Sequence, residues 1–421
     1  MEKIKVAIIG AGSSYTPEII EGFVKEKAWL PIGELALYDI DRNRLKIMAS
    51  FCRRFLKYLN HEITITEATS LEEAIKGSTF IDVQIRVGGN KQRILDEKIP
   101  LKYGQLGQET TGVGGMMKAL RTIPVMLEIA RAVEQFAPNA WIINYTNPTG
   151  LVAEAVTKYS KAKIAGLCSG VLFPAWIVNQ QLNVPEEDVY YDYVGLNHLN
   201  FAYNINIKGR PLTDEEFEKI ADNGVFGSLN PEIVKTLKLI PSPYLQYYYH
   251  TADRVKGLQE KPTSRGEDIL ELEKEIFAAY ADESQNTKPE ALARRGGGGY
   301  SEIALAVMKA IYTNSDKIIL VNVPNKGAIR QLPDDAVVEI PCVVNSSGIR
   351  GLSVPEVPQA IWGLISAVKN YEQLTVEAAM TGSKAKALMA LMAHPLITDF
   401  DVAKPMLDEM LEANKEYVHL T

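Results

Sequence analysis

Cys168 and His198 are the two side chains of this sequence whose types and surroundings most directly suggest a metal site. Cys168 ends an apolar run, and His198 stands in Gly-Leu-Asn-His, in a predicted turn between two strands. A thiolate and an imidazole suit a borderline-soft divalent ion, with substrate oxygens completing the coordination. Two protein ligands 30 residues apart are too few for a structural zinc site. Spacing alone favours the plainer alternative, a buried cysteine and a hydrogen-bonded histidine.

A glycine-rich turn follows the first predicted strand. Residues 4–17 read Ile-Lys-Val-Ala-Ile-Ile-Gly-Ala-Gly-Ser-Ser-Tyr-Thr-Pro, an apolar strand that runs into Gly10 and Gly12. Gly10 permits a tight turn, and Gly12 lets the backbone approach a pyrophosphate at the N-terminus of the next helix. Tyr15 stands where the dinucleotide-binding fingerprint has its third glycine. The alternative is therefore a strand-to-helix turn that binds nothing.

Three further residues favour a dinucleotide at this turn. Ser13 and Ser14 can add hydroxyl donors for phosphate oxygens. Asp39 follows the second predicted strand, where a carboxylate can accept hydrogen bonds from the adenosine ribose. An acidic residue at this position favours NAD over NADP, so NAD is the expected cofactor.

The segment Pro243-Tyr-Leu-Gln-Tyr-Tyr-Tyr249 is dense in tyrosine. A tyrosine serves as a base where a metal ion or an arginine lowers its pKa towards neutrality. More often such clusters are packing aromatics with hydrated hydroxyl groups.

Strand and helix patterns alternate through residues 1–165, which predicts an α/β fold with a Rossmann-type parallel sheet covered by helices on both faces. The predicted strands are Lys5–Ile9, Glu34–Tyr38, Glu62–Thr66, Phe80–Arg86, Trp141–Asn144 and Ile164–Leu167. The predicted helices are Pro17–Lys25, Arg42–Leu59, Leu71–Ala74, Ala119–Phe136 and Leu151–Lys158. We expect this segment to be the NAD-binding domain.

Residues 166–421 are expected to form a mixed α+β domain that binds metal and substrate. Its predicted strands are Tyr190–Val194, Leu199–Ile207, Lys317–Val321 and Ala336–Val344. Its predicted helices are Glu267–Tyr280 and a helical C-terminus of Ile361–Tyr371, Val376–Met380, Lys384–Met392 and Val402–Tyr417. Residues 208–242 and 284–300 have the composition of loops.

The bulk composition excludes several classes of protein. A net charge of −7 disfavours nucleic acid as the main partner. Three widely spaced cysteines imply no disulfide framework, and no apolar run is long enough to span a bilayer. The first strand begins almost at the N-terminus, without a signal-peptide core. The chain is expected to be cytoplasmic, with no membrane partner.

Ten short blocks follow one another along nearly the whole chain. They are Gly10-Ala-Gly-Ser-Ser-Tyr-Thr-Pro17, Arg86-Val-Gly, Arg93-Ile-Leu-Asp-Glu97, Gly107-Gln-Glu-Thr110, Asn144-Tyr-Thr-Asn-Pro148, Gly166-Leu-Cys168, Gly195-Leu-Asn-His198, Pro243-Tyr-Leu, Arg295-Gly-Gly and Val338-Glu-Ile-Pro341. In this order they resemble the family-4 glycoside hydrolases, specifically the 6-phospho-β-glucosidase branch. Any one block alone would be weak evidence, whereas the ordered set is highly specific.

The resemblance implies a hydrolysis unlike the usual two-carboxylate displacement. Bound NAD⁺ would oxidise C3 of the sugar, which acidifies the proton on C2. A divalent ion, typically Mn²⁺, would be held by Cys168 and His198, and a tyrosinate at Tyr244 would take that proton. Elimination of the C1–O bond, addition of water and return of the hydride would follow.

The resemblance also assigns the surrounding residues. Arg86 would belong to the cofactor site, and Asn147 would contact the sugar hydroxyls beside the metal. Arg93 and Arg265 would bind the 6-phosphate or the sugar, giving an acidic protein a local cationic pocket. The alternative for Arg93 is a surface salt bridge to a neighbouring carboxylate. Glu109 would act in the second shell of the metal or of the tyrosine.

One departure from the family pattern bears on specificity. Ser169 follows the metal cysteine, where the α-glucoside branch has an aspartate that protonates the leaving group. This disfavours an α-glucosidase and leaves the leaving-group acid unassigned. The expected substrate is a phosphorylated disaccharide or β-glucoside 6-phosphate, and gluco and galacto sugars both stay open. Homodimers or homotetramers are usual for the family.

Two readings from other classes remain. An NAD-dependent hydroxy-acid dehydrogenase of the malate or lactate type would share the N-terminal architecture. It would need a His–Asp pair near a substrate arginine, and no convincing pair is present. A non-catalytic sugar or redox sensor would have lost the metal ligands or Tyr244, and all three residues are retained.

Overall fold

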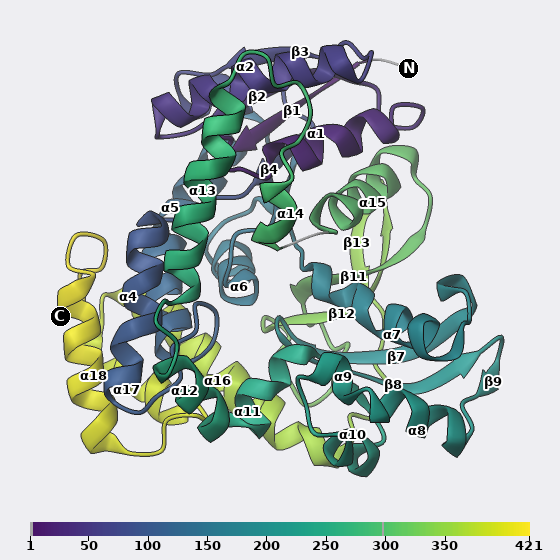
Figure 1. Cartoon of the computed structure of the whole chain (residues 1–421), viewed down its shortest axis with the longest axis vertical. Coiled ribbons are helices and arrows are strands. Elements are labelled where there is room, and N and C mark those ends of the chain that lie inside the picture. The colour runs from purple at the N-terminus through teal and green to yellow at the C-terminus, as the bar shows by residue number, and fades with distance from the viewer. Residues whose placement is uncertain (1–2, 297–298) are drawn as a thin grey trace.

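The computed structural model of the chain describes residues 3–296 and 299–421. Gly297 and Gly298 lie outside the described residues, so the Arg295-Gly-Gly block is described only as far as Gly296. Figure 1 shows a large sheet with its helices towards one end of the molecule and a smaller antiparallel sheet, β7 and β8, towards the other.

A nine-stranded sheet forms the centre of the first region, in the order β13-β12-β11-β6-β5-β4-β1-β2-β3. Its strands are β1 (Ile4–Ile9), β2 (Ile32–Tyr38), β3 (Thr64–Glu67), β4 (Phe80–Val83), β5 (Trp141–Asn144), β6 (Lys163–Gly166), β11 (Lys317–Pro324), β12 (Val337–Asn345) and β13 (Gly348–Gly351). The six N-terminal strands pair in parallel. The predicted α/β fold with a Rossmann-type sheet is confirmed.

Both faces of this sheet are buried. Val6 and Ile8 of β1 belong to one hydrophobic cluster, and Ala7 and Ile9 belong to the other. A strand buried on both faces is apolar throughout instead of alternating, which is why the run Val6–Ile9 predicts it so clearly. The covering helices are α1 (Thr16–Lys25), α2 (Arg42–Tyr58), α3 (Leu71–Ile75), α4 (Gly89–Lys102), α5 (Gly112–Phe136), α6 (Thr149–Tyr159) and α15 (Tyr300–Thr313).

Three helices of this region are missed or shortened by the sequence prediction, and one of them is α15, which was not predicted. α4 was not predicted, because Pro100 stands inside it and its apolar residues do not form a clear stripe. α5 begins at Gly112 and not at Ala119. Glycines in its first turn disfavour a helix in the sequence, but Gly114 and Gly115 are needed where that turn packs closely against residues 108–110. Strand β4 ends at Val83, three residues before the predicted end.

A second, four-stranded antiparallel sheet follows in the order β10-β8-β7, with β9 also paired to β8. Its strands are β7 (Val189–Leu196), β8 (Leu199–Ile207), β9 (Arg210–Pro211) and β10 (Ile240–Pro241). The neighbouring helices are α7 (Phe173–Leu182), α8 (Asp214–Asp222), α9 (Gly224–Gly227), α10 (Pro231–Leu237), α11 (Gln246–Tyr249) and α12 (Thr251–Gln259). Residues 208–242 are therefore not a loop. The other segment expected to be a loop, 284–300, contains the short helix α14 (Ala291–Arg295) and the first residue of α15. Helix α8 is started by a capping box between Thr213 and Glu216, a signal present in the sequence.

The C-terminal part is largely helical. Its helices are α13 (Arg265–Ala281), α14 (Ala291–Arg295), α16 (Gln359–Thr381), α17 (Lys384–Ala393) and α18 (Phe400–Ala413). The two predicted helices 361–371 and 376–380 are one helix, α16, since no glycine or proline separates them. In Figure 1, α13 runs from beside α12 and α4 up to α2, so it bridges the two ends of the molecule.

The large sheet takes strands from both sides of residue 165, because β11 pairs with both β6 and β12. The boundary between domains 1–165 and 166–421 stays a prediction. Across the part of the chain that the structure describes, none of the helices has the length and apolar character needed to cross a membrane.

Candidate active site

The glycine turn is closed by the end of β2. The amides of Gly10 and Ala11 donate to the Tyr38 carbonyl, and the amide of Gly12 donates to Asp39 Oδ2 at 2.8 Å. A Cβ on Gly12 would lie 2.8 Å from the same Asp39 oxygen. Glycine is therefore required here because the backbone and the carboxylate touch. The close approach that the structure shows at Gly12 is to Asp39, and the approach to a pyrophosphate stays a prediction.

Asp39 is oriented by backbone donors on both of its oxygens. Asp41 N–H donates to Oδ1 at 2.8 Å, opposite the bond from Gly12. Burial raises the pKa of Asp39, although these amides and nearby Arg44 oppose the rise. The geometry fits a carboxylate held at the edge of a nucleotide site, at the C-terminal end of a parallel strand.

Ser14 points into the protein. It is fully buried, and its hydroxyl donates to Glu273 Oε1 of α13 at 2.6 Å. Arg295 Nε contacts the same oxygen at 2.6 Å, and Arg44 contacts the other at 2.5 Å. Burial alone would raise the pKa of Glu273, but the two arginines hold it below its ordinary value. Ser13 is half-buried and its amide caps the turn by donating to the Gly10 carbonyl.

Cys168 lies just past β6, at the edge of the sheet where open α/β folds place ligands. It is buried, and its sulfur accepts from Gly170 N–H at 3.4 Å and from the side chain of Asn197. Burial is the main cause that raises the pKa of the thiol to about 12, and the nearby Glu339 carboxylate adds to it. The shared contact with Asn197 brings the cysteine next to the turn that holds His198.

His198 occupies the second position of a two-residue turn between β7 and β8, since Leu196 pairs with Leu199. Its φ is +64°, a conformation that histidine tolerates better than most residues. Burial lowers the pKa of His198 to about 4, so the imidazole is neutral near pH 7. The ring stacks on Tyr244 with centroids 3.8 Å apart and planes 9° from parallel.

The two predicted metal ligands and the predicted base therefore lie in one region, since Cys168 contacts Asn197 and the adjacent His198 stacks on Tyr244. Cys168 comes from the end of β6, His198 from the β7–β8 turn and Tyr244 from a 3-10 turn at Pro243–Leu245. The structure describes no cluster of three or more His, Cys, Asp or Glu side chains, within residues 3–296 and 299–421, that could hold a metal ion. A cysteine–histidine pair fits an ion whose remaining ligands are substrate oxygens and water.

Beneath this turn lies a buried carboxylate that the sequence reasoning missed. Glu339 of β12 accepts from Tyr193 Oη at 2.7 Å, from Asn200 Nδ2 at 2.8 Å and from Asn322 Nδ2 at 2.8 Å. It also accepts from Asn197 Nδ2 at 3.4 Å. An acidic residue inside the apolar run Val-Val-Glu-Ile-Pro was the available signal. Its bonds hold the β7–β8 turn against the large sheet.

Glu109 is surrounded by three cations. Arg86 pairs with it closely, Lys118 Nζ lies 2.8 Å away, and Arg93 Nη2 lies 3.4 Å away. Burial alone would raise the pKa of Glu109, but Arg86, Lys118 and Arg93 hold it well below its ordinary value. Burial lowers the pKa of Lys118 to about 7, an effect that Arg86 increases and Glu109 opposes. Lys118 was not predicted, although a lysine within the apolar start of α5 is unusual.

Glu97 links Arg93 to the first turn of α13, the helix that begins at Arg265. Arg93 Nε donates to Glu97 Oε1 at 2.7 Å, and the Gly266 amide donates to Oε2 at 2.7 Å. The alternative salt bridge for Arg93 is present, but it is buried and not on the surface. Arg265 is exposed at the start of α13 and donates to the Arg295 carbonyl at 2.7 Å. The Arg93 guanidinium therefore lies against Glu97, whereas that of Arg265 lies against the Arg295 carbonyl at the end of α14.

Asn147 precedes Pro148 through a cis peptide bond, in the connection from β5 to α6. Its side chain is half-buried, and Oδ1 accepts from Thr149 Oγ1 at 3.4 Å. Because β5 lies beside β6 in the sheet, Asn147 leaves the same edge as Cys168. This position agrees with the predicted contact to a ligand at that edge.

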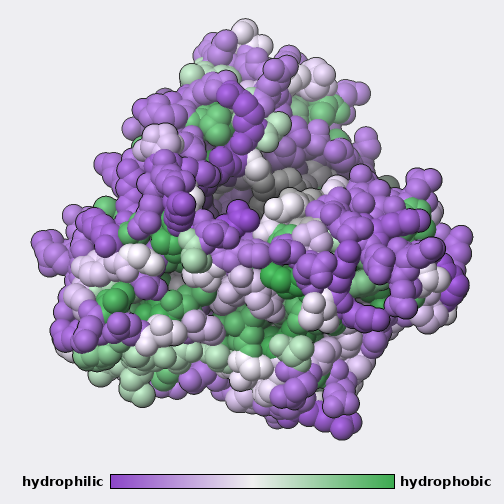
Figure 2. All heavy atoms as spheres, turned by 60° about the horizontal axis from the view of Figure 1, so that its bottom comes forward, coloured by the Kyte–Doolittle hydropathy of each residue, from purple (hydrophilic) through white to green (hydrophobic). Residues whose placement is uncertain are grey.

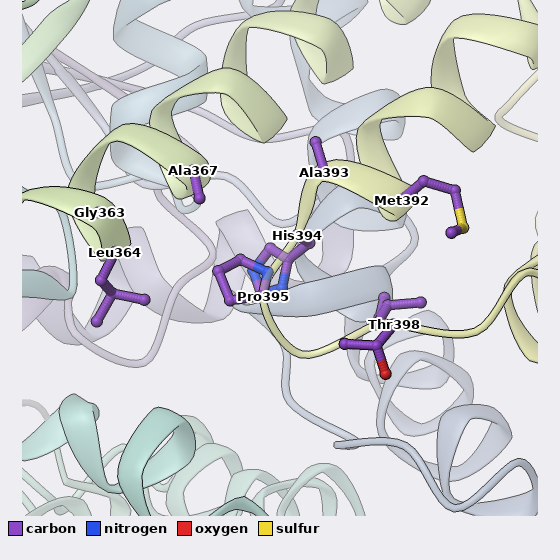
Figure 3. Close-up of a pocket in the computed structure, with 9 residues that line it drawn as sticks. Gly363, Leu364, Ala367, Met392, Ala393, His394, Pro395 and Thr398 are labelled. Atoms are coloured by element: carbon purple, nitrogen blue, oxygen red, sulfur yellow. The ribbon is translucent and has the colours of Figure 1, made fainter.

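Two hollows on the surface lie elsewhere. One, of about 620 Å³, is drawn in Figure 3 between Leu364 and Ala367 of α16 and the segment Met392–Thr398. The other, of about 360 Å³, shares Leu364, Pro395 and Thr398 and adds Tyr248 and Tyr249. Neither lining includes a residue predicted for the active site. Figure 2 shows apolar side chains gathered on the face formed by this end of the molecule.

Comparison with known proteins gives consistent matches over nearly the full length. The model of the family 4 glycosyl hydrolases matches residues 5–184, and the model of the family 4 glycosyl hydrolase C-terminal domain matches residues 193–397. A probable 6-phospho-beta-glucosidase of Bacillus subtilis is 38% identical over 429 residues, covering 99% of this chain and 97% of that protein.

Solved structures give the same result. The 6-phospho-beta glucosidase of Thermotoga maritima, with NAD and glucose-6-phosphate, superposes with a TM-score of 0.93 at 38% identity, covering 100% of both chains. A 6-phospho-alpha-glucosidase from gut microorganisms, in complex with NAD and Mn²⁺, has a TM-score of 0.91 at 30% identity and the same coverage. With both family models and full-length relatives in agreement, the chain belongs to the family 4 glycosyl hydrolases.

Proposed function

We propose that this protein hydrolyses 6-phospho-β-glucosides with the help of NAD and a divalent cation, Mn²⁺ in the first instance. The observation that carries the proposal is that Cys168, the turn with His198, and Tyr244 lie together, and that Cys168 follows a parallel strand at the same edge of the sheet as the glycine turn. Two relatives at 38% identity support it: the probable 6-phospho-beta-glucosidase of Bacillus subtilis and the 6-phospho-beta-glucosidase of Thermotoga maritima, which is solved with NAD and glucose-6-phosphate.

The two groups fit the residues present. Gly10, Gly12 and Asp39 form a turn whose backbone and carboxylate can receive a dinucleotide, and Cys168 with His198 can hold one divalent ion. When bound, NAD⁺ would supply a reversible hydride acceptor for C3, and Mn²⁺ would supply a Lewis acid. A metal ion would also favour the thiolate of Cys168 over the thiol.

The chain's own residues would handle the proton and the substrate. Tyr244 would take the proton from C2 of the oxidised sugar, after which the C1–O bond breaks by elimination and water adds back. Arg93 and Arg265 would bind the 6-phosphate or the sugar. Asn147 would hold a sugar hydroxyl, and Arg86 would lie towards the cofactor. Glu109 would keep Arg86, Arg93 and Lys118 in place.

Membership of the family makes a malate- or lactate-type dehydrogenase the less supported alternative. Membership of the family does not by itself fix the preference for α- or β-linked substrates, because both α- and β-glucosidases are among the relatives. Ser169 directly follows Cys168 and cannot protonate a leaving group at neutral pH as a carboxylic acid could. We therefore place the chain with the β-specific enzymes.

The protein is also proposed to act in the cytoplasm, on sugars phosphorylated during uptake, and to assemble as a homodimer or homotetramer. Met389, Met392 and Phe400 are 58%, 39% and 50% exposed on α17 and α18, and Met392 lines the hollow in Figure 3. They offer a surface for self-association. Sedimentation of Met389→Lys against the unchanged protein would test whether this face is used.

The central experiment is hydrolysis of p-nitrophenyl-β-glucoside 6-phosphate in D₂O, with and without NAD⁺ and Mn²⁺, following deuterium at C2 of the product. We expect cleavage only with both additions, and deuterium at C2. Cleavage without deuterium would require a C2-deuterated substrate to separate a shielded base from direct displacement. No cleavage, with steady NADH formation from another hydroxy compound, would favour the dehydrogenase. The galacto and α-linked analogues would define the sugar.

A further inference from the structure

We propose that Gln108 and Thr110 fix the imidazole of His198 in the tautomer that carries its hydrogen on Nδ1, so that the Nε2 lone pair is free for a divalent cation. The inference rests on the proposed metal role of His198 and deepens it. Gln108 and Thr110 are positioning residues, since they act through His198 and not on the substrate.

The first step fixes the orientation of the Gln108 amide. The backbone N–H of Thr110 makes a short hydrogen bond to the side-chain atom Oε1 of Gln108. A backbone N–H can only donate, so its partner must be the amide oxygen and not the amide nitrogen. This contact settles an orientation that geometry otherwise leaves open.

The second step fixes the hydrogen of the Thr110 hydroxyl. Thr110 Oγ1 lies 2.8 Å from the same Gln108 Oε1. Since the amide oxygen has no hydrogen to offer, the hydroxyl must donate. A hydroxyl group has one hydrogen, and this contact uses it.

The third step reaches the histidine. Thr110 Oγ1 also lies 3.0 Å from His198 Nδ1. Because the hydroxyl hydrogen already points to Gln108, Oγ1 can only accept in this contact, and Nδ1 must be the donor. A neutral imidazole carries a single hydrogen, so Nε2 carries the lone pair. An imidazole must be neutral and present a lone pair in order to bind a metal ion.

The segment that carries these two residues is held firmly. A Cβ on Gly107 would lie 1.8 Å from the Glu97 carbonyl oxygen of α4. A Cβ on Gly114 would lie 2.3 Å from the Gln108 carbonyl oxygen, and one on Gly115 would lie 2.6 Å from the Thr110 carbonyl carbon. The three glycines let residues 107–110 pack directly between α4 and the first turn of α5. The hydroxyl of Thr110 is therefore placed by backbone packing.

The other side of the ring is equally constrained. Tyr244 stacks on the imidazole face at 3.8 Å, so the ring cannot turn over without displacing the tyrosine. With Nδ1 bound to Thr110 and one face covered, Nε2 is the remaining polar position. Partners that orient a ligating histidine in this way typically change metal affinity by about 10 to 100-fold when removed.

Nitrogen-15 labelling of histidine tests the tautomer directly. The chain has five histidines, so the two-bond nitrogen–proton spectrum of the metal-free protein is simple, and His198→Gln identifies the resonances of His198. We expect His198 in the unchanged protein to be protonated at Nδ1. The same variants are then titrated with Mn²⁺ alone, and free Mn²⁺ is followed by electron paramagnetic resonance.

Four substitutions separate the roles. Thr110→Val removes the acceptor and should raise the Kd for Mn²⁺ by about 10 to 100-fold, while Thr110→Ser should restore it. Gln108→Leu frees the Thr110 hydroxyl to donate to Nδ1, which should move the hydrogen to Nε2 and weaken Mn²⁺ binding as strongly. Gln108→Glu keeps the acceptor and should keep both tautomer and affinity. Thr157→Val, whose hydroxyl bonds only helix carbonyls, is the matched control.

An Nε2-protonated His198 in the unchanged protein would overturn the proposal. So would equal Mn²⁺ affinities for Thr110→Val, Thr110→Ser and the control. If Thr110→Val does not fold, the contrast between Gln108→Leu and Gln108→Glu decides. An unchanged protein that shows the expected tautomer but binds no Mn²⁺ would overturn the metal role, and with it the proposed function, independently of the tautomer.

Discussion

At the scale of single residues, the active site depends on side chains whose chemistry is set by burial. Cys168 and His198 are each 7% exposed, and in both cases loss of water disfavours the charged form. A divalent cation is the partner that would favour the thiolate of the one and the neutral ring of the other. The other two cysteines, Cys52 and Cys342, are buried in the hydrophobic core.

Cys168→Ala and Cys342→Ala should therefore behave differently. We expect Cys168→Ala to raise the Kd for Mn²⁺ by more than about 100-fold, above the effect usual for outer-shell partners. Cys342→Ala should keep Mn²⁺ affinity and instead lose about 1 kcal/mol of stability from the small cavity in β12. Mn²⁺ titration and urea unfolding of both variants measure the two effects. Equal Mn²⁺ affinities would argue against Cys168 as a ligand.

Tyr244→Phe removes the proposed base and keeps the ring that stacks on His198. Turnover should fall by about 10² to 10⁴-fold, the range usual for a lost general base, while Mn²⁺ and NAD⁺ affinities stay within about twofold. Tyr249→Phe, four residues into α11 and packed against the core, is the control. If Tyr244→Phe retains C2 exchange at the rate of the control, another group is the base.

At the scale of elements, the nucleotide end is built from strands buried on both faces, and one of them carries an unusual group. Asp82 in β4 is 1% exposed, and its Oδ1 has no partner among the described residues. Burial raises its pKa to about 7. The folded protein therefore keeps a proton on Asp82 that the unfolded chain would release above its ordinary pKa of 3.8.

This difference predicts the sign of a pH effect. Between pH 3.8 and about 7 the folded state binds the extra proton, so the contribution of Asp82 to stability is complete below pH 3.8 and is lost as pH rises through 7. Asp82→Asn mimics the protonated form. We expect the variant to be more stable than the unchanged protein at pH 8, by up to roughly 4 kcal/mol, and similar at pH 4. Urea unfolding at the two pH values measures it, and an equal difference at both would contradict the assignment.

At the scale of the whole molecule, α13 connects the C-terminal half to the nucleotide turn. Glu273 binds Ser14, Arg44 and Arg295 together, and Tyr280 of the same helix donates to the Ser14 carbonyl at 2.9 Å. The start of α13 binds Glu97 through the Gly266 amide. One helix thus touches both the proposed cofactor site and the proposed phosphate site (Figure 1).

Glu273→Gln should loosen this connection. We expect the Kd for NADH to rise by about 3 to 10-fold, equivalent to about 0.6 to 1.4 kcal/mol. Glu275→Gln, on the same helix, breaks an exposed pair with Arg294 and should change neither NADH affinity nor stability measurably. Fluorescence titration with NADH compares the two. A similar affinity for both variants would mean that the turn keeps its shape without α13.

The sequence by itself determined the parts of this protein that depend on near neighbours. Local periodicity predicts the alternating strands and helices of residues 1–165. Short sequence blocks predict the glycine turn and single out Cys168, His198 and Tyr244 as site residues. The capping boxes of α8 and α13 are of the same kind, although only the second helix was predicted. Each of these features depends on residues that are close together in the sequence.

Only the tertiary structure decided which distant residues meet. Ser14 and Glu273 are 259 positions apart, and β11 joins β6 across about 150 residues. Local sequence patterns do not predict the packing partners that give buried polar residues their roles. Examples are Glu339, Lys118 and the hydrogen bonds that connect Gln108, Thr110 and His198. The physical reason is that a buried polar group needs a hydrogen-bond partner, and packing of elements from distant parts of the chain supplies that partner. The role of such a group is therefore fixed only in the folded structure.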